Sequence, residues 1–233
     1  KQLEEERLKE KLRANEAQLQ YYQLQTDPHF YLNCLNTIST LLQNEKKEVA
    51  NDMIIALSGH FRYMFRKSRS LVLLKEELEE VQDYCRIYNI RNGIPLLVDM
   101  DVSKSEMLCK VPILCIQTFV ENAIKYYGKN WQMLQVRIQI RRIKKEDKKE
   151  FLKIRITDNG VGYTKENLDE FNKPVDKFVY KSSHVGIDNL KYRFKLIFEN
   201  EADIYFYNAP YSGAVVEMTI PVKEDDSDEN INN

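Results

Sequence analysis

The sequence predicts an α+β protein in two parts, a helical hairpin followed by a domain with a mixed sheet. Within residues 29–88, apolar side chains recur at the three- and four-residue spacing of amphipathic helices. Residues 134–157 instead alternate apolar and polar side chains, as half-buried strands do. With 233 residues, the chain is long enough for one or two domains and a substantial core.

The composition excludes several classes of protein. Lysine and arginine number 35 against 36 aspartates and glutamates, and this net charge of -1 does not indicate a nucleic-acid binder. The four cysteines form no C-x-x-C pair and no metal-ligand spacing with histidine, so we expect no zinc site and a reducing compartment. No stretch reaches the roughly 18 apolar residues of a membrane helix.

Residues 1–26 predict a signalling helix of coiled-coil type. The 4-3 spacing of a coiled-coil seam is followed by Leu8, Leu12, Asn15, Leu19, Tyr22 and Thr26, with polar residues at two of the six positions. A solvated charged helix is the alternative. The chain opens within this charged run and without methionine. We therefore expect a fragment whose upstream part is absent, and a membrane sensor is the candidate for that part.

Residues 27–92 predict the helical part. Two amphipathic helices, 29–43 and 49–64, flank the polar break "QNEKKE" and form an αα-hairpin. A hairpin with one wide apolar face must bury it elsewhere, and a four-helix bundle in a dimer does so. A third helix runs from 74 to a stop signal at Asn92-Gly93.

Residues 93–222 predict the α+β domain. Strands are expected at 134–143, 151–157, 202–209 and 214–220, and helices at 113–127 and 187–199. This order favours a mixed or antiparallel sheet with helices on one face. The acidic, polar tail 223–233 is predicted to be disordered.

His29 is a candidate functional residue because it follows a proline within a helical pattern. The chain has only three histidines, and Pro28 stands directly before this one. Proline removes a backbone donor and disturbs a helix, which could expose the imidazole. The alternative is a helix that begins at Asp27-Pro28, with a cap and then proline in its first turn.

A glycine-rich turn supplies a candidate nucleotide loop. In "TDNGVGY", Asp158 ends a strand, while Gly160 and Gly162 let the backbone turn sharply and approach a ligand. An ordinary Asn-Gly hairpin turn is the alternative.

Two predicted helices carry polar pairs that suit a nucleotide. In "FVENAIKYYG", Asn122 and Lys125 share a helix face and suit magnesium and phosphate respectively. In "HVGIDNLKYRF", Gly186 leads into a helix with Asn189 and Arg193 one turn apart, and a glycine before a helix N-terminus is a natural phosphate seat. Each pair alone could be a solvated helix face.

Taken together, these motifs resemble the kinase portion of LytS/YehU-type sensor histidine kinases. Four segments carry the resemblance in order: "QTDPHFYLNCLNTI", "FVENAIKYYG", "DNGVG" and "HVGIDNLKYRF". The acidic helix "LLKEELEEVQDYCRIYNIR" also matches that family. The resemblance covers residues 20–222 and implies an ATP-binding α/β sandwich of the GHKL type attached to a dimeric hairpin.

The resemblance implies a role for each candidate residue. His29 would take the γ-phosphoryl group of ATP and pass it to an aspartate of a response regulator. Asn122 would hold Mg²⁺, Lys125 and Arg193 would meet phosphates, and Asp158 would accept from the adenine amino group. The glycines and Asn189 would complete the ATP site.

Further implied roles concern the proton, the product and the lid. Phe30 replaces the acidic residue that follows the phosphoacceptor in many other histidine kinases, so Asp27 and Glu121 are both candidate proton acceptors. Asn33, one turn after His29, would orient water for dephosphorylation of the regulator, or simply help to cap the disturbed helix. Residues 163–185 would form a mobile lid.

The same resemblance places the protein as the cytoplasmic domain of a bacterial plasma-membrane homodimer. Two alternatives stay open. A GHKL ATPase would need a carboxylate base where Thr118 stands. A degenerate nucleotide-binding scaffold is suggested by His184 and Tyr126, which replace a glycine and a histidine of the family motifs.

Overall fold

The computed structural model describes residues 28–64, 70–92, 95–126, 133–145, 148–174, 185–198 and 201–222. The chain divides into two compact units, Lys1–Arg69 and Ser70–Asn233. The predicted coiled coil at 1–26, the tail at 223–233 and residues 175–184 of the predicted lid lie outside the described residues.

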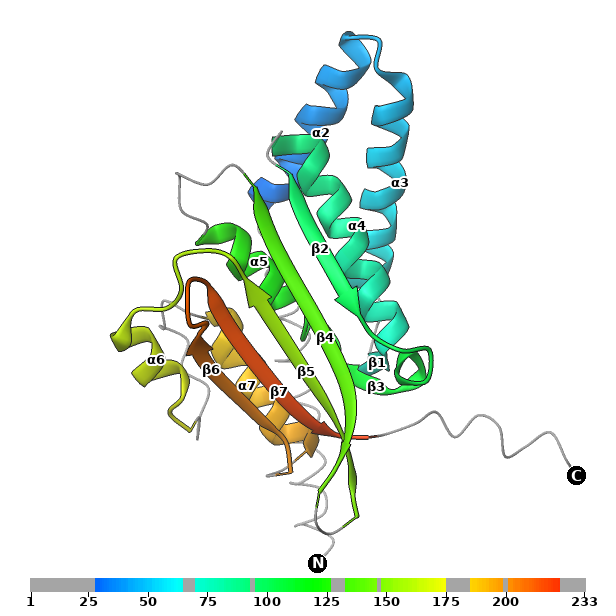
Figure 1. The fold of residues 1–233 in the computed structure, drawn as a ribbon. Helices are drawn as coiled ribbons and strands as arrows, with labels where there is room; N and C mark the ends of the chain where they lie inside the picture. The colour runs from blue at the N-terminus through cyan, green and yellow to red at the C-terminus, as the bar shows by residue number, and fades with distance from the viewer. Residues whose placement is uncertain are drawn as a thin grey trace, which may run out of the picture. The chain divides into compact units, whose positions relative to one another are not determined.

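The first unit contains the predicted hairpin. Helix α2 (Pro28–Gln43) and helix α3 (Lys47–Met64) are joined by a short turn in which Glu45 adopts a φ of 62° (Figure 1). The described part of α2 begins at Pro28, and a proline is tolerated in the first helical turn. Cys34, Ala50 and Met53 are fully buried in this hairpin.

Much of the apolar surface of the hairpin stays exposed in a single chain. Six large apolar side chains of α2 and α3 are between 39% and 59% exposed: Leu32, Leu35, Leu42, Val49, Ile54 and Ile55. An exposed apolar patch on a short helical hairpin marks an interaction surface.

The second unit is an α+β sandwich, as predicted. Its helices are α4 (Leu74–Asn92), α5 (Gln117–Lys125), α6 (Lys165–Phe171) and α7 (Val185–Phe198), with a 3-10 turn η1 (Glu106–Leu108). Its strands are β1 (Leu71–Leu73), β2 (Leu96–Asp101), β3 (Lys110–Pro112), β4 (Leu134–Lys144), β5 (Glu150–Asp158), β6 (Asp203–Asn208) and β7 (Ala214–Pro221). None of the described helices is long and apolar enough to cross a membrane.

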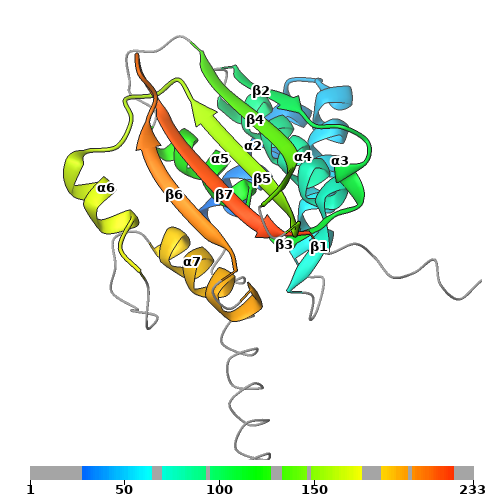
Figure 2. The same ribbon diagram turned by 60° about the horizontal axis from the view of Figure 1, so that its bottom comes forward.

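Five strands form the mixed sheet in the order β2-β4-β5-β7-β6. β2 lies parallel to β4, and the remaining pairs are antiparallel. Alternate residues of β4 are buried or exposed, which confirms the predicted half-buried strand. Helices α4, α5 and α7 lie on the buried face, and Figure 2 shows the opposite face uncovered. That open face carries ion pairs such as Asp99–Arg137 and Arg155–Glu217.

The structure differs from the sequence predictions in two places. Helix α5 begins at Gln117 rather than 113, because a turn in which Leu114 has a φ of 61° precedes it. Helix α4 packs within the second compact unit, while the domain boundary predicted at residue 92 stays a prediction. The parallel edge strand β2, the two-stranded β1-β3 ribbon and α6 were not predicted, since all are short and β2 alternates only weakly.

Candidate functional site

Asp158 ends β5 with its carboxylate fixed by backbone donors. Its Oδ1 accepts hydrogen bonds from the amide of Gly160 at 2.8 Å and from the amide of Ala214 at 3.1 Å. Burial raises the pKa of this carboxyl, and the two backbone bonds partly oppose the shift. Because Oδ1 takes both backbone bonds, Oδ2 is the oxygen that remains for a ligand donor.

The glycines at this loop permit close backbone approach. Gly213 (φ 99°), in the β6-β7 turn, packs so closely that a Cβ there would lie 1.8 Å from the carbonyl oxygen of Asp158. Gly162 (φ 78°) is similarly confined, because its Cβ would lie 2.7 Å from Oδ1 of Asn208. Both positions require the left-handed backbone that glycine adopts readily.

Two asparagine amides complete the backbone pairing of the loop. The Asn159 amide accepts from the backbone nitrogen of Gln135 at 2.8 Å and donates to the carbonyl of Met133 at 3.1 Å. The Asn208 amide makes the same pair of bonds to the two backbone groups of Tyr163, at 2.7 and 2.9 Å. The loop around Asp158 is thus held at both ends.

Helix α5 brings a second group of predicted residues. The Nδ2 atom of Asn122 is buried and has no hydrogen-bond partner in the described part of the chain. Lys125 is exposed, with its ammonium 5.3 Å from the ring centre of Tyr126. The Thr118 hydroxyl donates to the carbonyl of Leu114 at 2.6 Å, so it caps a backbone group.

Helix α7 lies against α5. A Cβ on Gly186 would be 3.5 Å from Cγ2 of Thr118, which places the start of α7 beside α5. Oδ1 of Asn189 is buried and unpartnered among the described residues. Arg193 is only 5% exposed, and its Nη2 donates to the carbonyl of Ile113 at 2.6 Å.

These residues gather at one end of the second unit. Figures 1 and 2 both place the end of β5 beside α5. Buried polar atoms without partners are rare in folded proteins, and a bound ligand is one explanation for them. The end of β5, α5 and the start of α7 therefore form a cradle of a carboxylate, two amides and a lysine.

Glu121, a candidate proton acceptor, lies on the side of α5 toward α4. Its Oε1 accepts from Nε2 of Gln117 at 2.8 Å. Its charge also contributes to the raised pKa of Tyr84 in α4, after the larger effect of burial. The other candidate, Asp27, lies outside the described residues, and so does His184.

His29 is exposed on α2, in the other unit. The Nδ2 atom of Asn33 lies 3.1 Å from His29 Nδ1, one helical turn away. His60 of α3 is instead buried at 3% exposure, where its Nε2 lies 3.2 Å from the Tyr31 hydroxyl. The structure thus distinguishes an accessible imidazole from a packed one.

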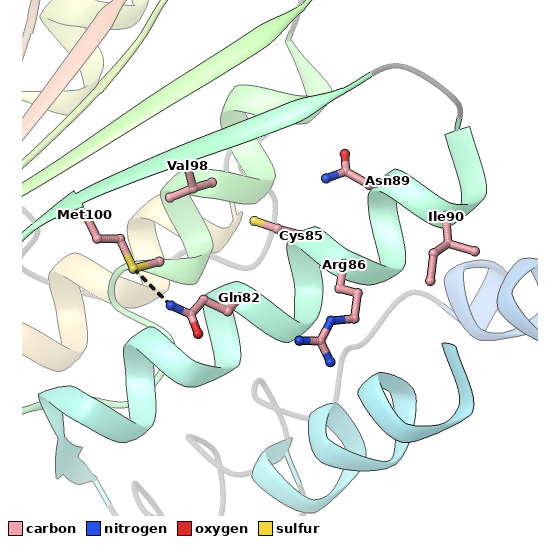
Figure 3. A pocket seen from close by; sticks show the side chains of 7 residues that line it. All are labelled: Gln82, Cys85, Arg86, Asn89, Ile90, Val98 and Met100. Carbon is pink, nitrogen blue, oxygen red and sulfur yellow. Dashed lines mark hydrogen bonds between the residues drawn. The ribbon is translucent and has the colours of Figure 1, made fainter. Parts of the chain in front are cut away.

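A groove of about 450 Å³ lies elsewhere, between α4 and β2 (Figure 3). Gln82 and Met100 face each other across it, with Nε2 3.8 Å from the thioether sulfur. None of the residues predicted to bind a ligand lines this groove. Among the described residues, buried side-chain atoms without partners occur on Asn122 and Asn189 of the cradle and on Gln117 of α5, and none occurs on the residues that line the groove.

Sequence reasoning missed Glu77, which is fully buried and contacts the turn before α5. A signal for it was present. Glu77 lies three residues after Leu74 and four before Val81, on the apolar stripe of its helix. A carboxylate at a core position indicates a specific buried partner.

Comparison with known proteins gives two family matches. Residues 17–96 match the family described as histidine kinase. Residues 112–224 match the family described as histidine kinase-, DNA gyrase B- and HSP90-like ATPase.

Two curated relatives agree with these matches. An uncharacterized sensor-like histidine kinase of Staphylococcus epidermidis is 29% identical over 90% of this chain and 40% of its own length. Sensor protein LytS of Staphylococcus saprophyticus is 31% identical over 88% of this chain and 34% of its own. The solved mycobacterial sensor histidine kinase MprB aligns at 12% identity with a TM-score of 0.47, covering 68% of this chain and all (100%) of that one. The chain thus spans well under half the length of these curated relatives.

Proposed function

Because this chain belongs to the histidine kinase family, we propose that it is the kinase portion of a two-component sensor protein of the LytS type. It would phosphorylate His29 with ATP and pass the phosphoryl group to an aspartate of a response regulator. The observation that carries the proposal is the cradle in the second unit. There, Asp158 keeps one carboxylate oxygen for a ligand, while buried amide atoms of Asn122 and Asn189 have no partner among the described residues.

The cradle fits an adenine nucleotide. Asp158 Oδ2 would accept from the adenine amino group, and Lys125 would meet the phosphates. A flip of the Asn122 side-chain amide would exchange the positions of Nδ2 and Oδ1. The unpartnered atom would then be an oxygen, a hard ligand that suits Mg²⁺. Asn189, Gly160, Gly162 and Gly186 would complete the ATP site.

Arg193 was predicted to meet a phosphate, and that contact stays a prediction. In the structure, its guanidinium is buried against the carbonyl of Ile113.

Phosphoryl transfer requires mainly that the reacting groups be aligned and that charge on the phosphates be neutralised. A ring nitrogen of His29 with a free lone pair would attack the γ-phosphorus. A nitrogen–phosphorus bond forms, the bond to the leaving ADP oxygen breaks, and the proton on the ring is lost to an acceptor. Bound Mg²⁺ would supply charge neutralisation on the phosphate oxygens. For the acceptor, Glu121 and Asp27 remain the proposed candidates.

The apolar surface of the hairpin supports the proposed dimer. Packing of α2 and α3 against the same helices of a second chain would bury the side chains exposed on both, such as Leu35 and Ile55. We further propose that the protein works at the cytoplasmic side of a bacterial plasma membrane, attached to a sensor region outside this chain.

ATP hydrolysis as the main reaction has less support. A GHKL ATPase needs a carboxylate base at position 118, and the Thr118 hydroxyl is engaged with a backbone carbonyl. A threonine in that arrangement has no means of activating water as a base.

The test is phosphorylation with labelled ATP and magnesium. The wild-type chain should acquire label that acid removes and base does not, the signature of phosphohistidine. His29→Gln should lose this label and still bind ATP. Substantial label on that variant would place the phosphoacceptor elsewhere, and ATP binding without any label in the wild type would favour the scaffold reading.

A further inference from the structure

The turn that precedes α5 is held from two sides by buried charged groups. On one side, the Glu77 carboxylate of α4 accepts three backbone hydrogen bonds. Its Oε2 accepts from the amide of Leu114 at 2.8 Å, and its Oε1 from Ile116 at 2.9 Å and Gln117 at 3.2 Å. Glu77 therefore satisfies amide groups at the start of α5 that have no partner within a helix.

On the other side, α7 contributes the buried Arg193, which donates to the carbonyl of Ile113 at 2.6 Å. Both charges also act on the pKa of the buried thiol of Cys115, within the turn. Burial raises that pKa, and Glu77 raises it further while Arg193 lowers it. The turn is thus clamped between a carboxylate and a guanidinium.

The clamp holds a backbone conformation that would not persist alone. Leu114 has a φ of 61°, in the left-handed region that a branched side chain avoids. Such a residue persists where its surroundings over-determine it, and it clusters at functional sites. Here the amide of the strained residue is itself bonded to Glu77.

Glu77 also lies close in sequence to the start of the second unit. The segment that opens this unit pairs with β3, through Leu71 opposite Pro112 and Leu73 opposite Lys110. β3 then runs directly into the clamped turn. The start of the second unit is therefore connected to α5 by the β1-β3 ribbon and, four residues beyond β1, by the carboxylate of Glu77.

We propose that Glu77 is a positioning residue of the nucleotide site, whose carboxylate fixes the start of α5 to α4 and so sets where Asn122 and Lys125 lie. The proposal rests on the proposed ATP site. Glu77 acts on the metal and phosphate end of the nucleotide, through α5. The adenine end depends on Asp158, which lies on β5 and is held by other bonds.

The first test is hydrogen exchange of the wild-type chain without nucleotide. The amides of Leu114, Ile116 and Gln117 should exchange as slowly as those of central strands such as β5, although they lie before α5 or at its first residue. Rapid exchange of these three amides in the wild type would overturn the clamp without any substitution.

The second test compares Glu77→Gln with Glu79→Gln. Glu79 lies on the same helix, with a side chain 59% exposed and paired only at the surface with Lys75. Glu77→Gln should speed exchange at residues 114–117 by about tenfold or more, because an uncharged amide replaces one of the two acceptor oxygens. Glu79→Gln should leave it unchanged. Faster exchange throughout the sheet would make Glu77 a general stability residue and reject the proposal.

The third test separates positioning from folding by titrating ATP with magnesium and with EDTA. Glu77→Gln should weaken ATP binding about tenfold in magnesium and less than that in EDTA, where only the proposed Lys125 contact is displaced. Equal losses in both, or none in either, would contradict the proposal. Failure of the wild type to bind ATP under both conditions would instead reject the proposed function. The hydrogen-exchange experiment would then still test whether Glu77 holds the turn.

Discussion

The side-chain amide nitrogen of Asn33 lies 3.1 Å from Nδ1 and 3.4 Å from Nε2 of His29, on the same face of α2. An amide NH₂ group only donates, so we expect the nearer ring nitrogen, Nδ1, to accept and the ring proton to reside on Nε2. Asn33→Ala should therefore raise the population of the Nδ1-protonated tautomer of His29. Nitrogen chemical shifts of labelled histidine, measured with the ring neutral, report the two forms.

The matched control is Asn36→Ala, an exposed asparagine on the same helix. It should leave the His29 shifts as they are in the wild type. Identical shifts in wild type and Asn33→Ala would show that this amide does not set the tautomer.

The same asparagine is expected to act on the phosphorylated regulator. An amide one turn from His29, the proposed phosphoacceptor, can orient a water without acting as a base. Asn33→Ala should keep autophosphorylation and lengthen the lifetime of the phosphorylated regulator in the presence of unphosphorylated kinase and nucleotide. If wild type and variant shorten that lifetime equally, Asn33 has only a structural role in the helix.

Two substitutions of Asp158 separate its effect on folding from its effect on ligand binding. Asp158→Asn keeps an oxygen for the Gly160 and Ala214 amides but places a donor where Oδ2 stood. We expect it to fold normally and to lose about 1–3 kcal/mol of ATP binding, up to roughly a hundredfold in affinity. Asp158→Ala should lose binding and thermal stability together. Unchanged ATP affinity in Asp158→Asn, measured by calorimetry, would argue against adenine recognition here.

The raised pKa of Asp158 also predicts a pH dependence of stability. Between its ordinary value of 3.8 and its higher folded-state value, the folded chain binds more protons at this carboxyl than the unfolded chain does. The Asp158 contribution to stability therefore decreases as pH rises through that window and stays unfavourable above it. Asp158→Asn removes the titration, so its stability relative to wild type should be greater at neutral pH than below pH about 4. Urea unfolding at several pH values measures this difference, and a constant difference would contradict the shift.

Two glycines near the site should respond oppositely to alanine. At Gly213 the new Cβ would collide with the backbone of Asp158 at a φ of 99°, so we expect destabilisation by about 2–5 kcal/mol. At Gly186 the new Cβ meets Thr118 at ordinary contact distance, 3.5 Å, within a helix. There alanine should be neutral or stabilising by up to about 1 kcal/mol. Thermal unfolding of the two variants gives the comparison, and equal effects would show that the β6-β7 turn yields easily.

The fold class was predictable because the two periodicities are unambiguous. The alternation around Ile138 and Ile154 specified the strand pair, and the heptad-like spacing around Leu78 specified α4. Short elements such as β1 carry too few residues for a period. The start of α5 was missed because a non-local carboxylate, that of Glu77, decides it, and no local pattern reports such a partner.

In the candidate site, too, local sequence features were predictable and non-local partners were not. Glycine in "DNGVG" marked the loop because its backbone shape needs it, and the role of Asp158 toward a ligand stays a prediction. Its supports, the Asn208 amide and Gly213, come from the far end of the chain. They became apparent only when tertiary pairing brought the β6-β7 turn onto Asp158.

The hydrogen bonds of the Asn159 side-chain amide also affect the chemical stability of the chain. In an unfolded chain, the nitrogen of a following glycine readily attacks an asparagine side-chain carbonyl, ammonia leaves, and the imide then opens to aspartate or isoaspartate. Here that nitrogen, on Gly160, is bonded to Asp158, and the Asn159 amide is held by backbone groups on both sides. Folding therefore protects the most deamidation-prone dipeptide of the loop. Each transient opening of the loop exposes this dipeptide to a slow, irreversible chemical change at the proposed ATP site.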